Sequence, residues 1–128
     1  MATKKSEPLR ILVADDSKVS RQLALNLLKD LHHEVVVAAT GQQAVKAVQE
    51  QRFDLVLMDM QMPELDGVEA TAKIRDHEKT AGSHVPIIAV TGEWNKEDRE
   101  RYLAAGMDDY ISKPIEPKEL LRVLKKFA

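Results

Sequence analysis

The chain has 128 residues, of which 44% are hydrophobic and 31% are charged, and its formal net charge is -2. This length fits one domain with one core, and the composition is that of a globular protein rather than a disordered or membrane protein. Lys and Arg residues are spread along the chain, so no concentrated basic face is indicated and direct nucleic-acid binding is not expected. The absence of cysteine excludes disulfides, thiolate metal sites and cysteine catalysis.

The N-terminal stretch MATKKSEP is charged and lacks an apolar h-region, and no apolar stretch of the sequence is long enough to span a membrane. We therefore expect a flexible tail over residues 1–8 and one domain over residues 9–128. We also expect no membrane insertion and a cytoplasmic location.

Short apolar runs alternate with amphipathic segments along the rest of the chain. The run at 9–14 predicts a strand, and a helix is predicted over 17–31 because apolar residues recur there at every fourth position: Val19, Leu23, Leu27 and Leu31. The unit repeats, with strands predicted at 34–38, 54–58, 86–90 and 110–112 and helices at 41–51, 68–78, 96–105 and 117–127. The longest loop is expected over 77–86.

These strands are apolar on both faces, which indicates a parallel sheet covered by helices on both sides. We predict an α/β fold, a flavodoxin-like doubly wound (βα)5 sandwich with five parallel strands in the order 2-1-3-4-5. Gly106 lies where a left-handed residue would end the fourth helix, and Pro117 suits the first turn of the fifth.

Polar residues follow four of the predicted strands at their carboxyl ends: Asp15, Asp16, Asp59, Thr91 and Lys113. In open α/β sheets, ligands bind outside these ends at the switch point in strand order. The five side chains, although scattered over about 100 residues, are therefore expected to converge on one pocket.

The three acids would bring three negative charges together, and two like charges about 4 Å apart repel by roughly 4 kcal/mol at an effective dielectric of 20. Lys113 offsets one of these charges. The remainder suits a hard divalent cation bound by oxygen, either Mg²⁺ or Mn²⁺, and Mg²⁺ commonly binds carboxylates together with phosphate oxygens. We therefore expect a metal and a phosphoryl group to bind together.

A carboxylate beside such a metal can attack a phosphoryl group and form an aspartyl phosphate. Asp59 is the expected nucleophile, because it is the lone acid at the tip of the predicted central strand, whereas Asp15 and Asp16 stand side by side as metal-holding groups. Thr91 and Lys113 are then left to contact the phosphoryl oxygens.

The segments ILVADDS, DLVLMDMQMPELDG, IIAVTG and DDYISKP, in this order and spacing, resemble the receiver domains of two-component response regulators over about residues 9 to 127. The resemblance implies that Asp59 accepts phosphate from a phosphohistidine and that Asp16 binds Mg²⁺ directly while Asp15 acts through water. It also implies that the Gln61 backbone carbonyl is a metal ligand, that Tyr110 is the rotating switch aromatic, and that the Lys113-Pro114 peptide is cis.

The pieces MDMQMPELDGVEATAKIR and AAGMDDYISKPI are particularly similar to the receivers of hybrid sensor histidine kinases. The expected partners are a sensor histidine kinase or a histidine phosphotransfer domain. Output would pass to a downstream protein or to a second copy through the face formed by 96–105, 110–112 and 117–127. The protein would be a signalling phosphoacceptor, catalysing only its own phosphotransfer and slow autodephosphorylation.

The stretch TGEWN at 91–95 departs from the usual hybrid-receiver pattern, in which the threonine is followed by Ala-Asn-Ala. Gly92 opens access beside the phosphate, and Gln61 and Glu93 flank the pocket, where they could orient or exclude water. We therefore expect these three residues to set the lifetime of the phosphoryl group.

Three other classes of function compete with this interpretation. A haloacid-dehalogenase phosphatase needs a second acid two residues after its nucleophile, where this chain has Gln61. A flavodoxin-like FMN binder needs a phosphate-cradling loop after the first strand, where the carboxylates of Asp15 and Asp16 would repel the phosphate. The third class is a phosphorylation-independent interaction module shaped like a receiver, and the intact set of five residues weighs against it.

Overall fold

A computed structural model describes residues 8–62, 65–92 and 96–127. Five strands alternate with five helices, and their bounds are β1 Arg10–Ala14, α2 Lys18–Asp30, β2 Glu34–Ala38, α3 Gly41–Glu50, β3 Leu55–Asp59, α4 Gly67–Ala81, β4 Ile87–Thr91, α5 Lys96–Ala104, β5 Asp109–Ser112 and α6 Pro117–Phe127. The strands form one parallel sheet in the order β2-β1-β3-β4-β5. The predicted class and strand order are confirmed.

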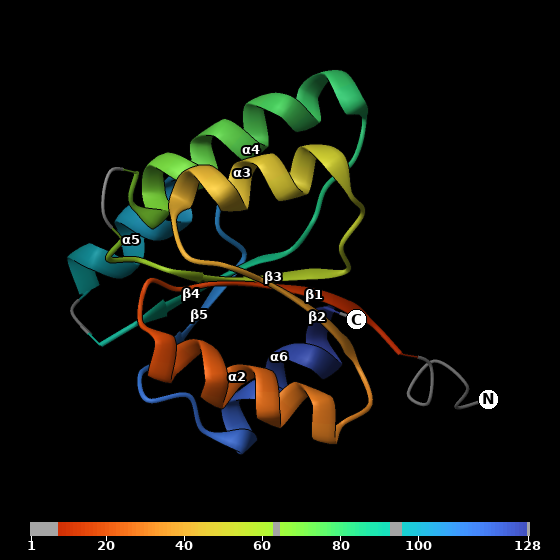
Figure 1. Cartoon of the computed structure of the whole chain (residues 1–128). Coiled ribbons are helices and arrows are strands. Elements are labelled where there is room, and N and C mark those ends of the chain that lie inside the picture. The colour runs from red at the N-terminus through yellow and green to blue at the C-terminus, as the bar shows by residue number, and fades with distance from the viewer. Residues whose placement is uncertain (1–7, 63–64, 93–95, 128) are drawn as a thin grey trace.

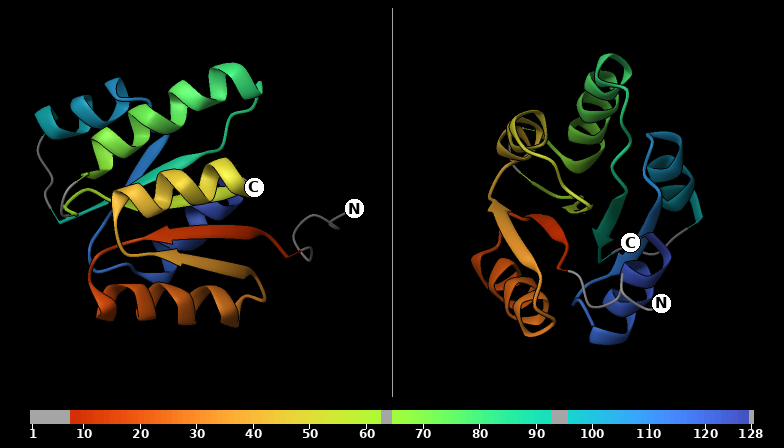
Figure 2. Two further views of the ribbon diagram at one scale, coloured as in Figure 1. Left: turned by 45° about the horizontal axis from the view of Figure 1, so that its top comes forward. Right: turned by 90° about the vertical axis from the view of Figure 1, so that its right-hand side faces the viewer.

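Helices cover both faces of the sheet (Figure 1), with α3, α4 and α5 on one side and α2 and α6 on the other. Figure 2 shows the same division from two further directions. Alternate residues of each strand enter two separate cores, because successive side chains of a strand point to opposite faces. Ile87 and Ala89 of β4 pack on the side of α3, α4 and α5, whereas Ile88 and Val90 pack on the side of α2 and α6.

The register of the strands aligns their carboxyl ends. Ala14 pairs with Met58, so the residues that follow, Asp15 and Asp59, lie on adjacent strands at the same level. Thr91 pairs with Ser112, which places Lys113 one residue beyond the end of β5. The sheet therefore presents these four residues at one edge.

The α4 helix begins directly behind the end of β3. Its capping box joins Asp66 and Glu69, each side chain accepting a hydrogen bond from the other residue's backbone N–H, at 2.9 and 3.2 Å. Gly67 permits this close approach, because a Cβ there would lie 2.6 Å from the backbone oxygen of Asp59. Helix α4 is thus seated against the strand end that carries Asp59.

Two details of the helices differ from the sequence-based predictions. The buried residues of α2 are Ala24 and Leu28, while Val19 is 79% exposed. A spacing of four residues advances by 40° at each step on a helix of 3.6 residues per turn, so the predicted stripe winds away from the sheet. Helix α4 continues to Ala81, into the predicted loop at 77–86, and ends where Gly82 adopts a left-handed conformation with φ of 72°.

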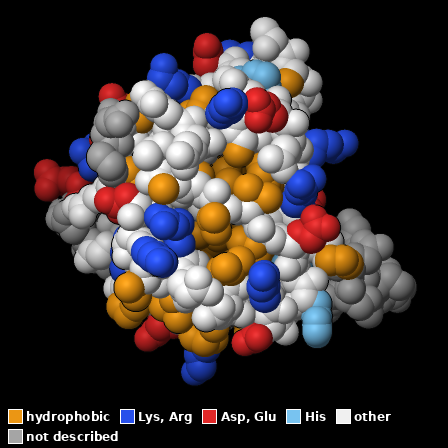
Figure 3. All heavy atoms as spheres, viewed as in Figure 1, with side chains coloured by type: hydrophobic (Ala, Val, Ile, Leu, Met, Phe, Trp, Pro, Cys, Tyr) orange, Lys and Arg blue, Asp and Glu red, His pale blue; other side chains and the backbone are white. Residues whose placement is uncertain are grey.

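Other local predictions are confirmed: α6 begins at Pro117, and Gly106 has a φ of 109° just beyond α5. The predicted tail falls almost wholly outside the described residues. No helix within the described ranges is long and apolar enough to cross a membrane. On the face shown in Figure 3, Lys and Arg side chains are interspersed with acidic and apolar ones rather than gathered in one patch.

Candidate functional site

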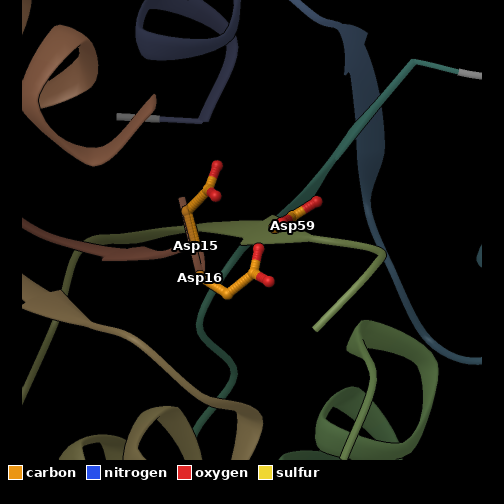
Figure 4. Close-up of side chains that lie close together, drawn as sticks. All are labelled: Asp15, Asp16 and Asp59. Atoms are coloured by element: carbon orange, nitrogen blue, oxygen red, sulfur yellow. The ribbon is translucent and has the colours of Figure 1, made fainter. Parts of the chain in front are cut away.

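Three carboxylates meet at the carboxyl edge of the sheet (Figure 4), on the loop after β1 and at the end of β3. One carboxylate oxygen from each of Asp15, Asp16 and Asp59 lies within 4.8 Å of the others. Asp15 and Asp59 are each only 3% exposed, whereas Asp16 is open to solvent. The predicted convergence of the acids is therefore observed, with two of them buried.

Lys113 inserts its ammonium group between the two buried acids. Its Nζ lies 3.1 Å from Oδ1 of Asp59 and 3.3 Å from Oδ2 of Asp15. The Lys113-Pro114 peptide is cis, as the resemblance implied, and the Lys113 backbone N–H donates to the Thr91 carbonyl at 2.9 Å. Both the backbone and the side chain of Lys113 are therefore held by contacts at this edge of the sheet.

The loop that carries Asp15 and Asp16 is held by hydrogen bonds of its own. The Ser17 N–H donates to Oδ1 of Asp15 at 2.9 Å, and the Arg21 guanidinium donates to the Asp15 carbonyl at 2.8 Å. Ser17 also caps α2, with its Oγ accepting from the Ser20 N–H at 3.3 Å. The acid pair is thereby tied to the first turn of α2.

The two oxygens of Asp59 have different surroundings. Oδ1 accepts from the Gln61 N–H at 3.2 Å in addition to its contact with Lys113. Oδ2 is buried and has no hydrogen-bond partner among the described residues. Buried carboxylate oxygens are normally satisfied, so Oδ2 marks a position where a ligand would complete the site.

Burial raises the pKa of Asp59 to about 6, because the charged form loses hydration and the neighbouring Asp15 charge adds to this effect. The hydrogen bonds from Lys113 and from the Gln61 backbone oppose the rise but do not cancel it. Burial also works against the charged form of Lys113, but the hydrogen bond and charge of Asp59, followed by those of Asp15, raise the pKa of the lysine above its usual value. The lysine is therefore held in its cationic form.

This donor set fits a hard divalent cation. Three carboxylates face one ammonium, so the four side chains carry a net negative charge when they are all ionised. All the side-chain ligands are oxygens. One of them is Oδ2 of Asp59, which has no partner in the part of the chain that the structure describes, and the exposed Asp16 leaves the site open to water. Mg²⁺ and Mn²⁺ favour such carboxylate and water ligands.

Thr91 ends β4 at the same edge and is 5% exposed. Its Oγ1 lies 3.5 Å from the hydroxyl of Tyr102 on α5. The side chain is therefore in contact with the helix layer above the sheet.

Tyr110 is half-buried on β5 and packs against the core beneath α3, α4 and α5. Arg99 of α5 donates to the Tyr110 hydroxyl at 3.1 Å, and its guanidinium lies 5.7 Å from the centre of the Tyr110 ring. The predicted switch aromatic is thus bound to α5 through Arg99.

The residues expected to control phosphate lifetime are only partly described. The Gln61 side chain is exposed, and Gly92 is exposed with open space on the side where a Cβ would be added. Glu93 lies outside the described residues.

Two residues of the site were missed from the sequence. Arg21 lies six residues after Asp15 and contacts its carbonyl from the first turns of α2, a spacing that matches no i,i+3 or i,i+4 helical pair and gave no signal in the sequence. Tyr102 reaches Thr91 only through the way α5 packs on the sheet, and no sequence pattern indicates that contact.

Residues 11–125 match the response regulator receiver domain family. The hybrid signal transduction histidine kinase I of Dictyostelium discoideum is 42% identical over 122 residues, which cover 91% of this chain and 7% of that protein. The sensor protein GacS of Pseudomonas syringae pv. syringae is 43% identical over 120 residues, covering 93% of this chain and 13% of that protein. The chain thus spans a small part of the length of these relatives.

Solved structures show the same similarity. The receiver domain of the sensor histidine kinase PA1611 from Pseudomonas aeruginosa, with magnesium in its active site cleft, is 40% identical with a TM-score of 0.85 over 94% of this chain and 98% of that one. The receiver domain of histidine kinase CKI1 from Arabidopsis thaliana, complexed with Mg²⁺ and BeF3⁻, is 36% identical with a TM-score of 0.86 over 93% and 89%. The receiver of Ssk1, bound to the histidine phosphotransfer protein Ypd1 from Saccharomyces cerevisiae, is 28% identical with a TM-score of 0.89 over 94% and 88%.

The match over nearly the whole chain agrees with the acid triad, the lysine and the parallel sheet described above. The chain therefore belongs to the response regulator receiver domain family of two-component phosphorelay signalling.

Proposed function

We propose that this receiver domain takes a phosphoryl group from a phosphohistidine onto Asp59. The proposal rests on the state of the Asp59 carboxylate, whose Oδ1 is held by Lys113 and the Gln61 N–H while Oδ2 has no partner within the described ranges. In the transfer, a carboxylate oxygen forms a bond to phosphorus, the bond between phosphorus and the histidine nitrogen breaks, and that nitrogen leaves with the electron pair. Lys113 stays charged and compensates the negative charge on the phosphoryl oxygens.

The cation that we propose for this site is Mg²⁺, for which Mn²⁺ could substitute. Asp15, Asp16, Asp59 and the Gln61 backbone carbonyl would hold it, with Asp16 binding directly and Asp15 through water. When bound, it neutralises charge on the carboxylates and on the incoming phosphoryl oxygens. The magnesium in the PA1611 and CKI1 receiver structures supports this assignment.

Thr91 and Tyr110 would couple phosphorylation to a conformational change of the face formed by α5, β5 and α6. The phosphoryl group replaces a charge near -1 with about -2 and adds three acceptor oxygens, which favours a state in which Thr91 and Lys113 close on it. Tyr110 would follow Thr91 inward, loosening its contacts with Arg99 of α5. The face formed by α5, β5 and α6 would then bind a downstream protein or a second copy.

The phosphodonor would be a sensor histidine kinase or a histidine phosphotransfer domain. The Ssk1 receiver in complex with Ypd1 supports the second source, and the hybrid kinases among the relatives support the first. We further propose that Gln61, Gly92 and Glu93 set the lifetime of the phosphoryl group, and the open space beside Gly92 would admit water there.

Intact mass measurement after incubation with phosphoramidate tests phosphoacceptance. We expect a gain equal to one phosphoryl group with Mg²⁺ present, no gain with EDTA, and no gain in Asp59→Asn. An unmodified wild-type mass after prolonged incubation with Mg²⁺ would instead favour the phosphorylation-independent interaction module.

A further inference from the structure

The contact between Thr91 and Tyr102 joins the phosphorylation site to α5 without passing through Tyr110. The two hydroxyl oxygens lie 3.5 Å apart, and both residues are buried, at 5% and 3% exposure. Within the described part of the chain, Thr91 is the hydrogen-bond partner of the Tyr102 hydroxyl. The distance is at the long limit for a hydrogen bond, but moving Thr91 away would leave the buried Tyr102 hydroxyl without a partner among the described residues, which is unfavourable.

The pleat of the sheet directs Thr91 away from the acid cluster. Residues at alternate positions of a strand share a face, so Thr91 shares the face of Ala89, beneath α3, α4 and α5. Asp59 shares the face of Leu57, and Lys113 that of Ile111, on the side of α2 and α6. Thr91 therefore lies on the opposite face of the sheet from Asp59 and Lys113, where its hydroxyl contacts Tyr102.

We propose that Tyr102 is a positioning residue that restrains Thr91 in the unphosphorylated state, an inference that rests on the function proposed above. Closing onto a phosphoryl group at Asp59 requires the Thr91 hydroxyl to turn from the α5 side toward the acid cluster. That turn breaks the contact with Tyr102 and leaves a buried phenolic hydroxyl without its partner. Tyr102 thus opposes activation and transmits each movement of Thr91 directly to α5.

The test uses Tyr102→Phe, which removes the hydroxyl and keeps the ring that packs in the core. Beryllofluoride is titrated with Mg²⁺ present, and binding is followed by calorimetry. We expect Tyr102→Phe to bind about two- to fivefold more tightly than the wild type, a gain of about 0.4 to 1.0 kcal/mol. A residue with a merely structural role would leave the affinity unchanged or lower it when removed.

Thr71→Val is the matched control. The Thr71 hydroxyl is fully buried and lacks a hydrogen-bond partner among the described residues, so the substitution also deletes a buried hydroxyl from the same side of the sheet. We expect its beryllofluoride affinity to equal that of the wild type. A gain in Thr71→Val as large as that in Tyr102→Phe would overturn the proposal, because it would show a general effect of hydroxyl deletion.

Methyl NMR of Thr91 provides a second readout that does not depend on affinity. In unphosphorylated Tyr102→Phe, the Thr91 methyl resonance should move toward its position in the beryllofluoride-bound wild type. An unmoved resonance, or an affinity at or below the wild-type value, overturns the role of Tyr102 while leaving phosphoacceptance by Asp59 intact. Failure of the wild type itself to bind beryllofluoride would overturn the proposed function and this inference with it.

Discussion

The ammonium of Lys113 lies 3.1 Å from Oδ1 of Asp59, while Oδ2 of the same carboxylate is buried without a partner among the described residues. One oxygen is therefore held by a cation, and the other is left for a ligand. The same ammonium lies 3.3 Å from Asp15, so its removal would leave two buried acids facing each other. This arrangement leads to separate predictions for metal binding and for phosphoryl transfer.

Replacing Lys113 with Met should separate these two properties. The acids lose the ammonium that compensates their charge, so Mg²⁺ should bind more tightly. Phosphorylation by phosphoramidate should slow by about 10² to 10³, because the phosphoryl oxygens lose the same positive charge. Calorimetry measures the first effect, and the rate of mass gain measures the second. Lys46→Met, an exposed substitution on α3 with the same change in net charge, should alter neither. An unchanged phosphorylation rate in Lys113→Met would contradict the role assigned to this lysine.

Stability of the metal-free protein should depend on the protonation of Asp59. The pKa of this residue is raised from 3.8 to about 6 in the folded protein, so the folded state binds more protons than the unfolded state between these values. The favourable contribution of Asp59 protonation to the free energy of unfolding is complete below about pH 4, and it is lost as the pH rises through about 6. The free energy of unfolding should therefore fall over this window.

Asp59→Asn removes that dependence. In EDTA at pH 8, we expect urea unfolding to show the variant to be more stable than the wild type by about 1 to 3 kcal/mol, and near pH 4 the difference should vanish. Asp76→Asn, at an exposed acid on α4, controls for net charge. A stability gain that persists unchanged at pH 4 would show that the titration of Asp59 is not its cause.

Gly67→Ala should disturb the junction between β3 and α4. An added Cβ would lie 2.6 Å from the Asp59 carbonyl oxygen and 2.9 Å from the sulfur of Met60, so the strand end or the helix must shift. We expect a loss of about 1 to 3 kcal/mol in the free energy of unfolding and slower phosphorylation. Gly92→Ala is the matched control for stability, because a Cβ there meets nothing within 4 Å. Equal stability of the two variants would contradict the role of Gly67.

Substitution of both Gln61 and Glu93 by Ala should change the rate of autodephosphorylation. The rate is measured as loss of the phosphorylated mass after removal of the donor. A change of less than about twofold, equivalent to a barrier difference near 0.4 kcal/mol, would end the proposal that these residues set the lifetime.

The positions of the strands could be predicted from local patterns, and the acid cluster followed from them together with the assumed strand order. Apolar runs identify the strands, and parallel strands bring their carboxyl ends to one edge, so Asp15 and Asp59 had to be neighbours once the order 2-1-3-4-5 was assumed. The cis peptide before Pro114 was expected only through the resemblance, since an X-Pro bond has no strong local preference for it.

Features that depend on how helices rotate against the sheet were not predictable. The apolar residues at every fourth position from Val19 indicated a helix but not which of its sides is buried, and the sheet is covered by Ala24 and Leu28. The same dependence hid the contact of Tyr102 with Thr91. Such contacts join residues on different elements, whose relative placement no single segment encodes.

Phosphoacceptance by Asp59 is decided by locating the phosphoryl group within the chain. The phosphorylated protein is reduced with borohydride, which converts an aspartyl phosphate to homoserine, and is then digested and sequenced by mass spectrometry. We expect conversion at position 59 alone and only when Mg²⁺ was present during phosphorylation. Conversion at Asp15 or Asp16, or a phosphoryl group found on a histidine, would contradict it.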